Sequence, residues 1–186
     1  MKRLWTWPLC ATLLIAGTRD TAVAADSTLI AFELQDQFKQ IHVDSTFRGS
    51  TLVVLVANKG GSLYSRKWSR TLRDSLAVWS WTDRVTVLGV AHMSGVPFFL
   101  KGFVKGKLPK DPKDWLLLDW KGQFFKSYEL SGDTCNVLLF DVEGRLRQKF
   151  AVGPVASATL DSVRNLVGEL LPPGIPEETG APPDPH

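Results

Sequence analysis

The chain divides into short apolar runs and longer stretches whose apolar residues recur at helical spacing. Continuous runs rich in Val and Leu occupy residues 52–57, 84–91 and 136–141, and each ends at a polar or glycine-containing turn. Runs of this length are typical of strands that are buried on both faces of a sheet. Shorter runs predict further strands at residues 28–34, 40–43, 115–119 and 145–152.

Helical spacing is clearest directly after the first of these buried strands. Residues 58–61 form a glycine turn, and Ser62 offers a hydroxyl group for the helix N-cap. The apolar residues that follow recur every four positions and predict one buried helix face: Tyr64, Trp68, Leu72 and Leu76. Functional residues in α/β folds commonly lie where a parallel strand ends, so we expect this turn to belong to any functional site.

Three further helices are predicted, and the first of them is ambiguous. Residues 96–108 combine apolar side chains with interleaved lysines. Such a helix could bind a partner or lie on a membrane surface; we expect instead that it covers the sheet and turns its lysines to water. The other two helices fall within residues 123–130 and 160–171.

Both ends of the chain differ from its centre. Lys2 and Arg3 precede an apolar stretch at residues 4–17, and small residues follow at 22–25. This pattern predicts that residues 1–25 are a secretory signal peptide, and the apolar stretch is too short to span a bilayer. Residues 26–171 form the predicted domain. Residues 172–186 contain six prolines and are predicted to be a disordered tail. We therefore expect an exported protein, in a bacterial periplasm or secreted, without a membrane span in the mature chain.

Removal of a signal peptide changes the charge and the cysteine content. It takes away three basic side chains and one acidic side chain, so the formal charge falls from +3 to about +1. A charge this small gives no support for a nucleic-acid partner. Cys135 is the one cysteine that remains, so an internal disulfide is excluded. The three histidines lie far apart and share no ligand spacing, and we expect neither a metal nor a cofactor.

The predicted order is a β-hairpin, three β-α units, a second β-hairpin and a final helix, which describes the thioredoxin architecture. Residues 32–37 (FELQDQ) resemble the opening F-x-L-x-D hairpin of peroxiredoxins, and residues 136–153 (NVLLFDVEGRLRQKFAVG) resemble their x-x-x-L-I-D-x-x-G-x-I hairpin. Over residues 31–171 the chain thus resembles the thioredoxin-like superfamily, nearest its redoxin branch of alkyl hydroperoxide reductases and thiol-specific antioxidants. The resemblance implies an α/β fold: a three-layer α/β/α sandwich with an N-terminal β-hairpin and a mixed central sheet.

The catalytic positions of that superfamily hold other residues here. In the W-C-x-x-C pattern of thioredoxins, Gly61 and Tyr64 take the two cysteine positions. In the T-x-x-C pattern of peroxiredoxins, Ser65 takes the position of the peroxidatic cysteine. A serine hydroxyl has no accessible anion near neutral pH and cannot form a sulfenic acid, so both alignments predict the absence of the family chemistry.

Cys135 is open to two interpretations. The resemblance places the family's cis-proline, which faces the active-site turn, at Cys135 or next to it. Cys135 could then be a lone thiol beside a partner-binding groove. We expect rather an inert cysteine buried at the start of a strand, since free cysteines are among the most buried residues.

These observations favour a binding or adaptor protein that is not an enzyme and whose protein or peptide partner is unidentified. The predicted binding groove comprises Gly60, Gly61, Ser62, Tyr64, Ser65, Cys135 and Asn136. Tyr64 is equally compatible with a contact residue and with the buried helix face. The alternative is a thiol-redox enzyme, peroxiredoxin-like or with a single cysteine, that acts through Cys135.

Overall fold

The computed structural model describes residues 27–171. The predicted signal peptide and the proline-rich tail lie outside the described residues. Within residues 27–171, no helix has the length and apolar character needed to cross a membrane.

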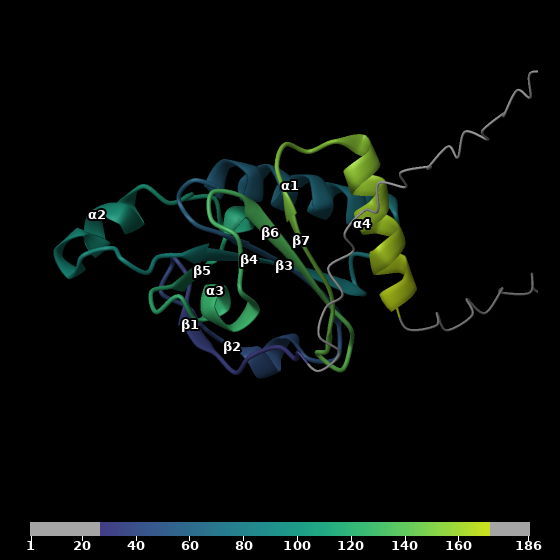
Figure 1. Cartoon of the computed structure of the whole chain (residues 1–186), viewed down its shortest axis with the longest axis horizontal. Coiled ribbons are helices and arrows are strands. Elements are labelled where there is room, and N and C mark those ends of the chain that lie inside the picture. Colours follow the sequence, from purple (N-terminus) through teal and green to yellow (C-terminus); the bar gives the residue numbers. More distant parts are fainter. Residues whose placement is uncertain (1–26, 172–186) are drawn as a thin grey trace, which may run out of the picture.

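A five-stranded mixed sheet forms the centre of the fold (Figure 1), with the strand order β5-β4-β3-β6-β7. The strands are β3 (Thr51–Ala57), β4 (Val85–His92), β5 (Leu117–Asp119), β6 (Cys135–Phe140) and β7 (Leu146–Val152). β3 pairs in parallel with β4 and β4 with β5, whereas β6 is antiparallel to both β3 and β7. All seven residues of β3 are buried, as the apolar run at residues 52–57 predicts for six of them.

Helices cover both faces of this sheet and produce three layers. Alternate residues of β3 point to opposite faces. Val53 and Leu55 pack against α1 (Ser62–Val78) and α4 (Ser157–Leu170). Val54 and Val56 belong to the core on the other face, which α3 (Gln123–Tyr128) closes with Phe124 and Tyr128. The predicted thioredoxin-like sandwich with a mixed sheet is confirmed.

The N-terminal hairpin is shorter than its sequence predicts. It consists of β1 (Glu33–Gln35) and β2 (Ile41–Val43), which pair antiparallel in a sheet of their own. The residues before β1 do not continue the strand because they bond elsewhere. The amide of Leu29 donates to the carbonyl of Gly144, and the Tyr128 hydroxyl accepts from the amide of Ile30 and donates to the carbonyl of Thr28.

The segment between β4 and β5 differs most from its prediction. It contains a 3₁₀ turn (Phe98–Leu100), the six-residue helix α2 (Lys101–Gly106) and a second 3₁₀ turn (Pro112–Asp114). No residue of α2 or of the first turn is buried, and the segment projects from the end of the sheet (Figure 1). The expectation of a sheet-covering helix was therefore wrong. We call residues 94–114 the lobe.

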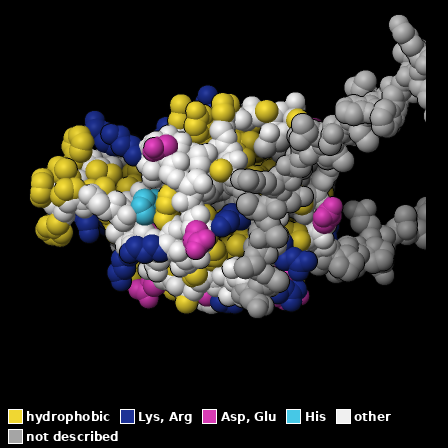
Figure 2. All heavy atoms as spheres, viewed as in Figure 1, with side chains coloured by type: hydrophobic (Ala, Val, Ile, Leu, Met, Phe, Trp, Pro, Cys, Tyr) yellow, Lys and Arg dark blue, Asp and Glu magenta, His cyan; other side chains and the backbone are white. Residues whose placement is uncertain are grey.

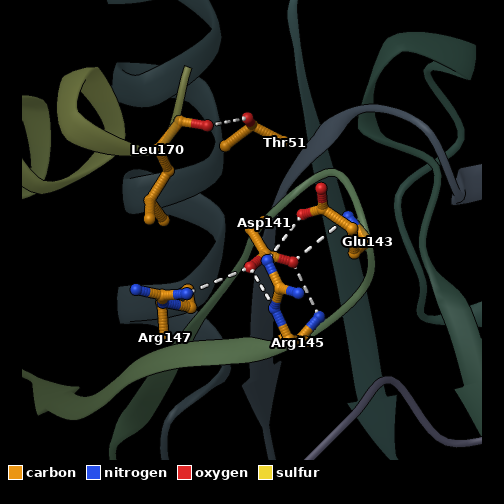
Figure 3. A network of polar contacts seen from close by, with 6 residues as sticks. All are labelled: Thr51, Asp141, Glu143, Arg145, Arg147 and Leu170. Carbon is orange, nitrogen blue, oxygen red and sulfur yellow. Dashed lines mark hydrogen bonds and ion pairs between the residues drawn. The ribbon is translucent and has the colours of Figure 1, made fainter. Parts of the chain in front are cut away.

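At the opposite end of the sheet, one buried carboxylate organises the β6–β7 turn (Figure 3). Asp141 follows β6 and accepts hydrogen bonds from the amides of Glu143 and Arg145. It also forms ion pairs with the side chains of Arg145, at 2.9 Å, and Arg147, at 3.3 Å. Burial acts to raise the pKa of Asp141, but these hydrogen bonds and the two guanidinium groups outweigh it, so the pKa is lowered.

Candidate functional site

The predicted turn between β3 and α1 is present, but its capping differs from the prediction. Ser62 is the first residue of α1 rather than its N-cap, which is Gly61. The hydroxyl of Ser62 donates to the carbonyl of Lys59 at 2.8 Å, within the turn itself. The amide of Gly61 donates instead to the side chain of Asn58, at 3.1 Å. The glycine turn is thus closed by an asparagine at the end of the buried strand.

Asn58 also fastens this turn to the loop that precedes β6. Its side-chain oxygen accepts from the amide of Asp133 at 3.2 Å, and its nitrogen donates to the Asp133 carboxylate at 3.2 Å. Asn136 also anchors this loop. Its side-chain oxygen accepts from the amide of Ser131, and its side-chain nitrogen donates to the carbonyls of Ser131 and Val56. Two asparagines, one directly after β3 and one near the start of β6, therefore fix the position of residues 131–134.

The two glycines of the turn lie in close contact with this loop. A Cβ atom on Gly61 would lie within 3.0 Å of the carbonyl oxygen, the carbonyl carbon and the Cα of Thr134. A Cβ atom on Gly60 would meet mainly the carboxylate of Asp133. Only glycine allows this approach of two backbones at position 61. In the resembled family the corresponding loop carries a cis-proline; all described peptide bonds of this chain are trans.

A pocket of about 920 Å³ opens beside the turn, at the carboxyl ends of β3 and β4. One wall consists of the first two turns of α1, including Ser62, Ser65 and Ser69. The facing wall comes from the lobe and from Trp115. Apolar residues of the strand ends and the lobe supply most of the lining: Val90, Ala91, Val96, Phe103, Val104, Leu108 and Trp115.

The charged groups at the pocket give it a positive character. Lys59, Arg66 and Lys107 belong to its lining. Of the two acidic residues of the lining, Asp114 forms an ion pair with Arg70, whereas Asp133 bonds to the neutral amide of Asn58 and keeps its charge, so three basic groups face one carboxylate that has no cation partner among the described residues. The pKa of Asp114 is lowered, chiefly by the hydrogen bond from Arg70. The pocket therefore suits a ligand that is apolar with negative charge.

His92 lines the floor of the pocket at the end of β4. Its Nε2 atom lies 2.6 Å from the hydroxyl of Ser94, and its ring stacks at a tilt on Phe125 with centroids 4.1 Å apart. The Nδ1 atom is buried without a hydrogen-bond partner among the described residues. Desolvation lowers the pKa of His92, so the ring is neutral at pH 7.

Cys135 is the one cysteine in the described range, and it is fully buried. It pairs with Ala57 in the β3–β6 ladder and belongs to the core that α1 and α4 cover. Burial raises the pKa of its thiol to about 12, and a hydrogen bond with the Ser65 side chain only partly opposes this shift. Such a thiol has the properties of a core residue rather than those of a nucleophile.

The pocket includes only part of the predicted groove. Gly60, Ser62 and Ser65 line it, whereas the other four predicted residues lie elsewhere. Tyr64 is half-buried and packs against the core under α1, and Gly61, Cys135 and Asn136 are buried. In the described part of the chain, no three His, Cys, Asp or Glu side chains are grouped as a metal site would require.

Several residues of this region were not predicted from the sequence. They are Asp133, Ser69 and His92. His92 ends β4, which is parallel to β3, and a search for polar residues at such positions would have found it. The lobe was predicted only as a helix over residues 96–108 that could bind a partner or a membrane surface, and not as a wall of the pocket.

Comparison with known proteins supports the fold. No family model and no curated protein matches the chain. Solved structures do: the exposed lipoprotein thioredoxin of Streptococcus pneumoniae has a TM-score of 0.54 and 21% identity, with 76% of this chain and 100% of that chain covered. The thioredoxin domain of a thiol-disulfide oxidoreductase from Bacteroides vulgatus has a TM-score of 0.56 and 20% identity, with 78% of this chain and 99% of that chain covered.

A thiol-disulfide isomerase from Corynebacterium glutamicum is similar to the same extent, with a TM-score of 0.54, 23% identity and coverage of 78% and 96%. Identities this low establish the architecture and leave the chemistry to the residues of the site. Together with the strand order and the three layers, these similarities show that residues 27–171 have the thioredoxin fold.

Proposed function

We propose that this chain is an exported binding protein of the thioredoxin fold that uses the pocket beside the β3–α1 turn without thiol-disulfide chemistry. The observation that carries the proposal is the state of Cys135. It is the one cysteine in the described range, it is fully buried, and the pKa of its thiol is about 12. The two cysteine positions of the thioredoxin pattern hold Gly61 and Tyr64.

The lining of the pocket supports a polypeptide ligand that is apolar and acidic. Its walls are mainly apolar, and they contain three basic groups, Lys59, Arg66 and Lys107, while of the two acidic residues Asp114 is neutralised by Arg70. A volume of about 920 Å³ accommodates several side chains of an extended segment. The ligand class proposed here is therefore a protein segment with apolar and acidic residues.

Binding to an array of immobilised decapeptides tests this assignment. Ser69→Trp places an indole in the pocket and should reduce the signal of apolar, acidic peptides at least tenfold. Ser162→Trp introduces the same side chain at an exposed position of α4 and serves as the matched control. Equal binding by the two variants would show that the pocket is not the binding site.

A second candidate, thiol-redox activity through Cys135, is favoured by the structural neighbours, which are a thioredoxin, a thiol-disulfide oxidoreductase and a thiol-disulfide isomerase. Insulin reduction and peroxide turnover separate the two candidates. We expect neither reaction to exceed that of a Cys135→Ser variant, because a single buried thiol cannot cycle an internal disulfide. Activity lost specifically in Cys135→Ser would establish the enzyme and reject the binding protein.

The reactivity of the thiol gives an independent measurement. In the folded protein, Cys135 should resist alkylation by iodoacetamide and become reactive only in denaturant. Peptide mass spectrometry measures the labelled fraction, and the same protein alkylated in denaturant gives the value for complete reaction. Rapid labelling of Cys135 in the native protein would contradict its assignment to the core.

Export is proposed from the first 25 residues and is tested separately. Mass spectrometry of the protein from an exporting host should find the mature N-terminus at Ala25 or Asp26. An intact Met1 in the membrane fraction would reject the cleaved, exported form while leaving the pocket assignment open to its own test.

A further inference from the structure

The lobe carries the largest group of exposed apolar side chains in the described residues. Phe98, Phe99 and Phe103 are 86%, 80% and 66% exposed, and Leu100 is 40% exposed. Figure 2 shows these hydrophobic side chains gathered on the projecting end of the molecule, with basic side chains beside them. Exposed aromatic groups of this extent are uncommon on a soluble domain and indicate a surface that contacts something else.

The base of the lobe is fixed to the domain. The side chain of Gln37 donates to the carbonyls of Pro109 and Asp114 and accepts from the amide of Leu116. Arg70 of α1 forms an ion pair with Asp114, and Arg73 donates to the carbonyl of Lys113. The phenylalanines therefore project from a supported base, and their exposure does not arise from an unanchored loop.

The charged side chains of the lobe up to residue 110 are all basic, and its two acidic residues, Asp111 and Asp114, follow at its end. Residues 84–110 contain no acidic residue, while the lobe supplies four lysines within this range: Lys101, Lys105, Lys107 and Lys110. Lys101 lies 5.8 Å from the ring centroid of Phe98, and Lys107 lies 5.4 Å from that of Phe103. Among the described residues no ion pair involves Lys101 or Lys107, so both cations stand beside the apolar tip with their charge free to meet an anionic partner.

We infer that the tip of the lobe, residues 98–107, binds the surface of a membrane that contains anionic phospholipid. Apolar rings that project beside lysines match the two layers of such a surface: the rings enter the boundary of the acyl chains, and the ammonium groups meet the lipid phosphates. Lysine stems also allow the charge to remain at the level of the headgroups while the rings are buried. Because the lobe also forms one wall of the pocket, this contact would hold the pocket close to the membrane.

An environment-sensitive nitrobenzoxadiazole label tests the inference. It is attached to the full chain in a Phe98→Cys variant and, as the matched control, in a Val78→Cys variant. Val78 is as exposed as the phenylalanines, at 82%, but it lies at the end of α1. Its neighbour Trp79 contacts Arg164 of α4, so this position does not belong to the lobe. Both proteins also carry Cys10→Ser, so the label lies at position 98 or 78 and not within the first 25 residues, which are the same in the two proteins.

Vesicles of phosphatidylglycerol and phosphatidylcholine should increase the emission of the label at position 98 at least twofold, with a blue shift, and leave position 78 unchanged. Lys101→Gln combined with Lys107→Gln in the Phe98→Cys chain should raise the lipid concentration at half-maximum roughly tenfold. High salt should have a similar effect.

Three results would overturn the inference. The first is equal behaviour of positions 98 and 78 with anionic vesicles. The second is an undiminished response to vesicles of phosphatidylcholine alone, which would remove the role of the lysines. The third is an emission increase that depends on protein concentration without vesicles, which would assign the tip to a second copy of the chain.

Discussion

Asn58 and Asp133 lie 75 positions apart in the sequence and bond to each other twice, amide to side-chain oxygen at 3.2 Å and side-chain nitrogen to carboxylate at 3.2 Å. This pair joins the end of β3 to the loop before β6 and forms one rim of the pocket. The same Asn58 oxygen accepts from the amide of Gly61. One side chain therefore sets the geometry of the whole turn.

Asn58→Ala should lower the free energy of unfolding by about 2 kcal/mol, because it leaves the amides of Gly61 and Asp133 without their acceptor. Urea unfolding measures the loss, and hydrogen exchange should accelerate at those two amides. Asn165→Ala, at an exposed position of α4, is the matched control and should change stability by less than about 0.5 kcal/mol. Equal effects of the two substitutions would contradict this role of Asn58.

Gly61→Ala should destabilise the fold by about 3 kcal/mol, because its Cβ would overlap the backbone of Thr134, which cannot turn aside. Gly60→Ala should have a smaller effect, about 1 kcal/mol, since the carboxylate of Asp133 can rotate. Gly102→Ala in α2 meets no atom within 4 Å and should be neutral or slightly stabilising. Thermal unfolding of the three proteins gives the order, and a Gly61→Ala protein as stable as Gly102→Ala would refute the close approach.

Tyr64→Ala should lower the free energy of unfolding by about 2 kcal/mol, because the ring packs against the core under α1. The ring does not line the pocket, so peptide binding by the folded variant should be unchanged. Denaturant titration and the peptide array give the two values. Stability within about 0.5 kcal/mol of the wild type, together with weakened binding, would instead assign Tyr64 to ligand contact.

Acidification should weaken the β6–β7 turn. The pKa of Asp141 in the folded state is lowered below the usual 3.8, so the unfolded chain takes up the proton first as the pH falls. The stabilisation is therefore complete above about pH 5 and is lost as the pH falls through 3.8 toward the folded-state pKa. Asp141→Asn should be less stable at pH 7 by about 2 kcal/mol, and its stability should change less between pH 5 and 3. Parallel pH profiles for the two proteins would contradict this account.

His92 should make the free energy of unfolding depend on pH in a second range, nearer pH 7. Its pKa is lowered below 6.5 by desolvation, so the folded protein resists a proton that the unfolded chain accepts. Stability is therefore highest above pH 6.5 and declines as the pH falls from 6.5 toward the folded-state pKa. Unfolding free energies at pH 7.5 and 5 should differ less in His92→Gln than in the wild type. A profile for His92→Gln that matches the wild type would exclude this group.

The sequence was sufficient to predict the fold because its signals are local and mutually consistent. β3 and β6 contain the apolar runs 52–57 and 137–140, and the four-residue spacing in α1 does bury Trp68, Leu72 and Leu76. The lobe shows where such signals are insufficient. Its apolar residues have a plausible helical pattern, but Gly102 and Gly106 lower the helix propensity of the segment, and α2 has only six residues.

The candidate site was only partly predictable for a related reason. Position along the chain identified the glycine turn, since it follows a buried parallel strand. It could not show that Tyr64 packs against the core under α1 and not in the pocket. Nor could it show that Asp133, in the loop before β6, bonds to Asn58. Such contacts depend on the path of loops far apart in sequence.

The contact between Gly61 and Thr134 also limits what protein engineering could achieve with this chain. In the alignment with the W-C-x-x-C pattern, Gly61 holds the place of the first cysteine, and the backbone of Thr134 fills the space that a cysteine side chain would need. Replacing only Gly61 and Tyr64 by cysteine, to introduce a dithiol, would force the backbones of residues 61 and 134 apart. A redox-active derivative would require residues 131–134 to be rebuilt at the same time, so the two loops constitute a single unit of design.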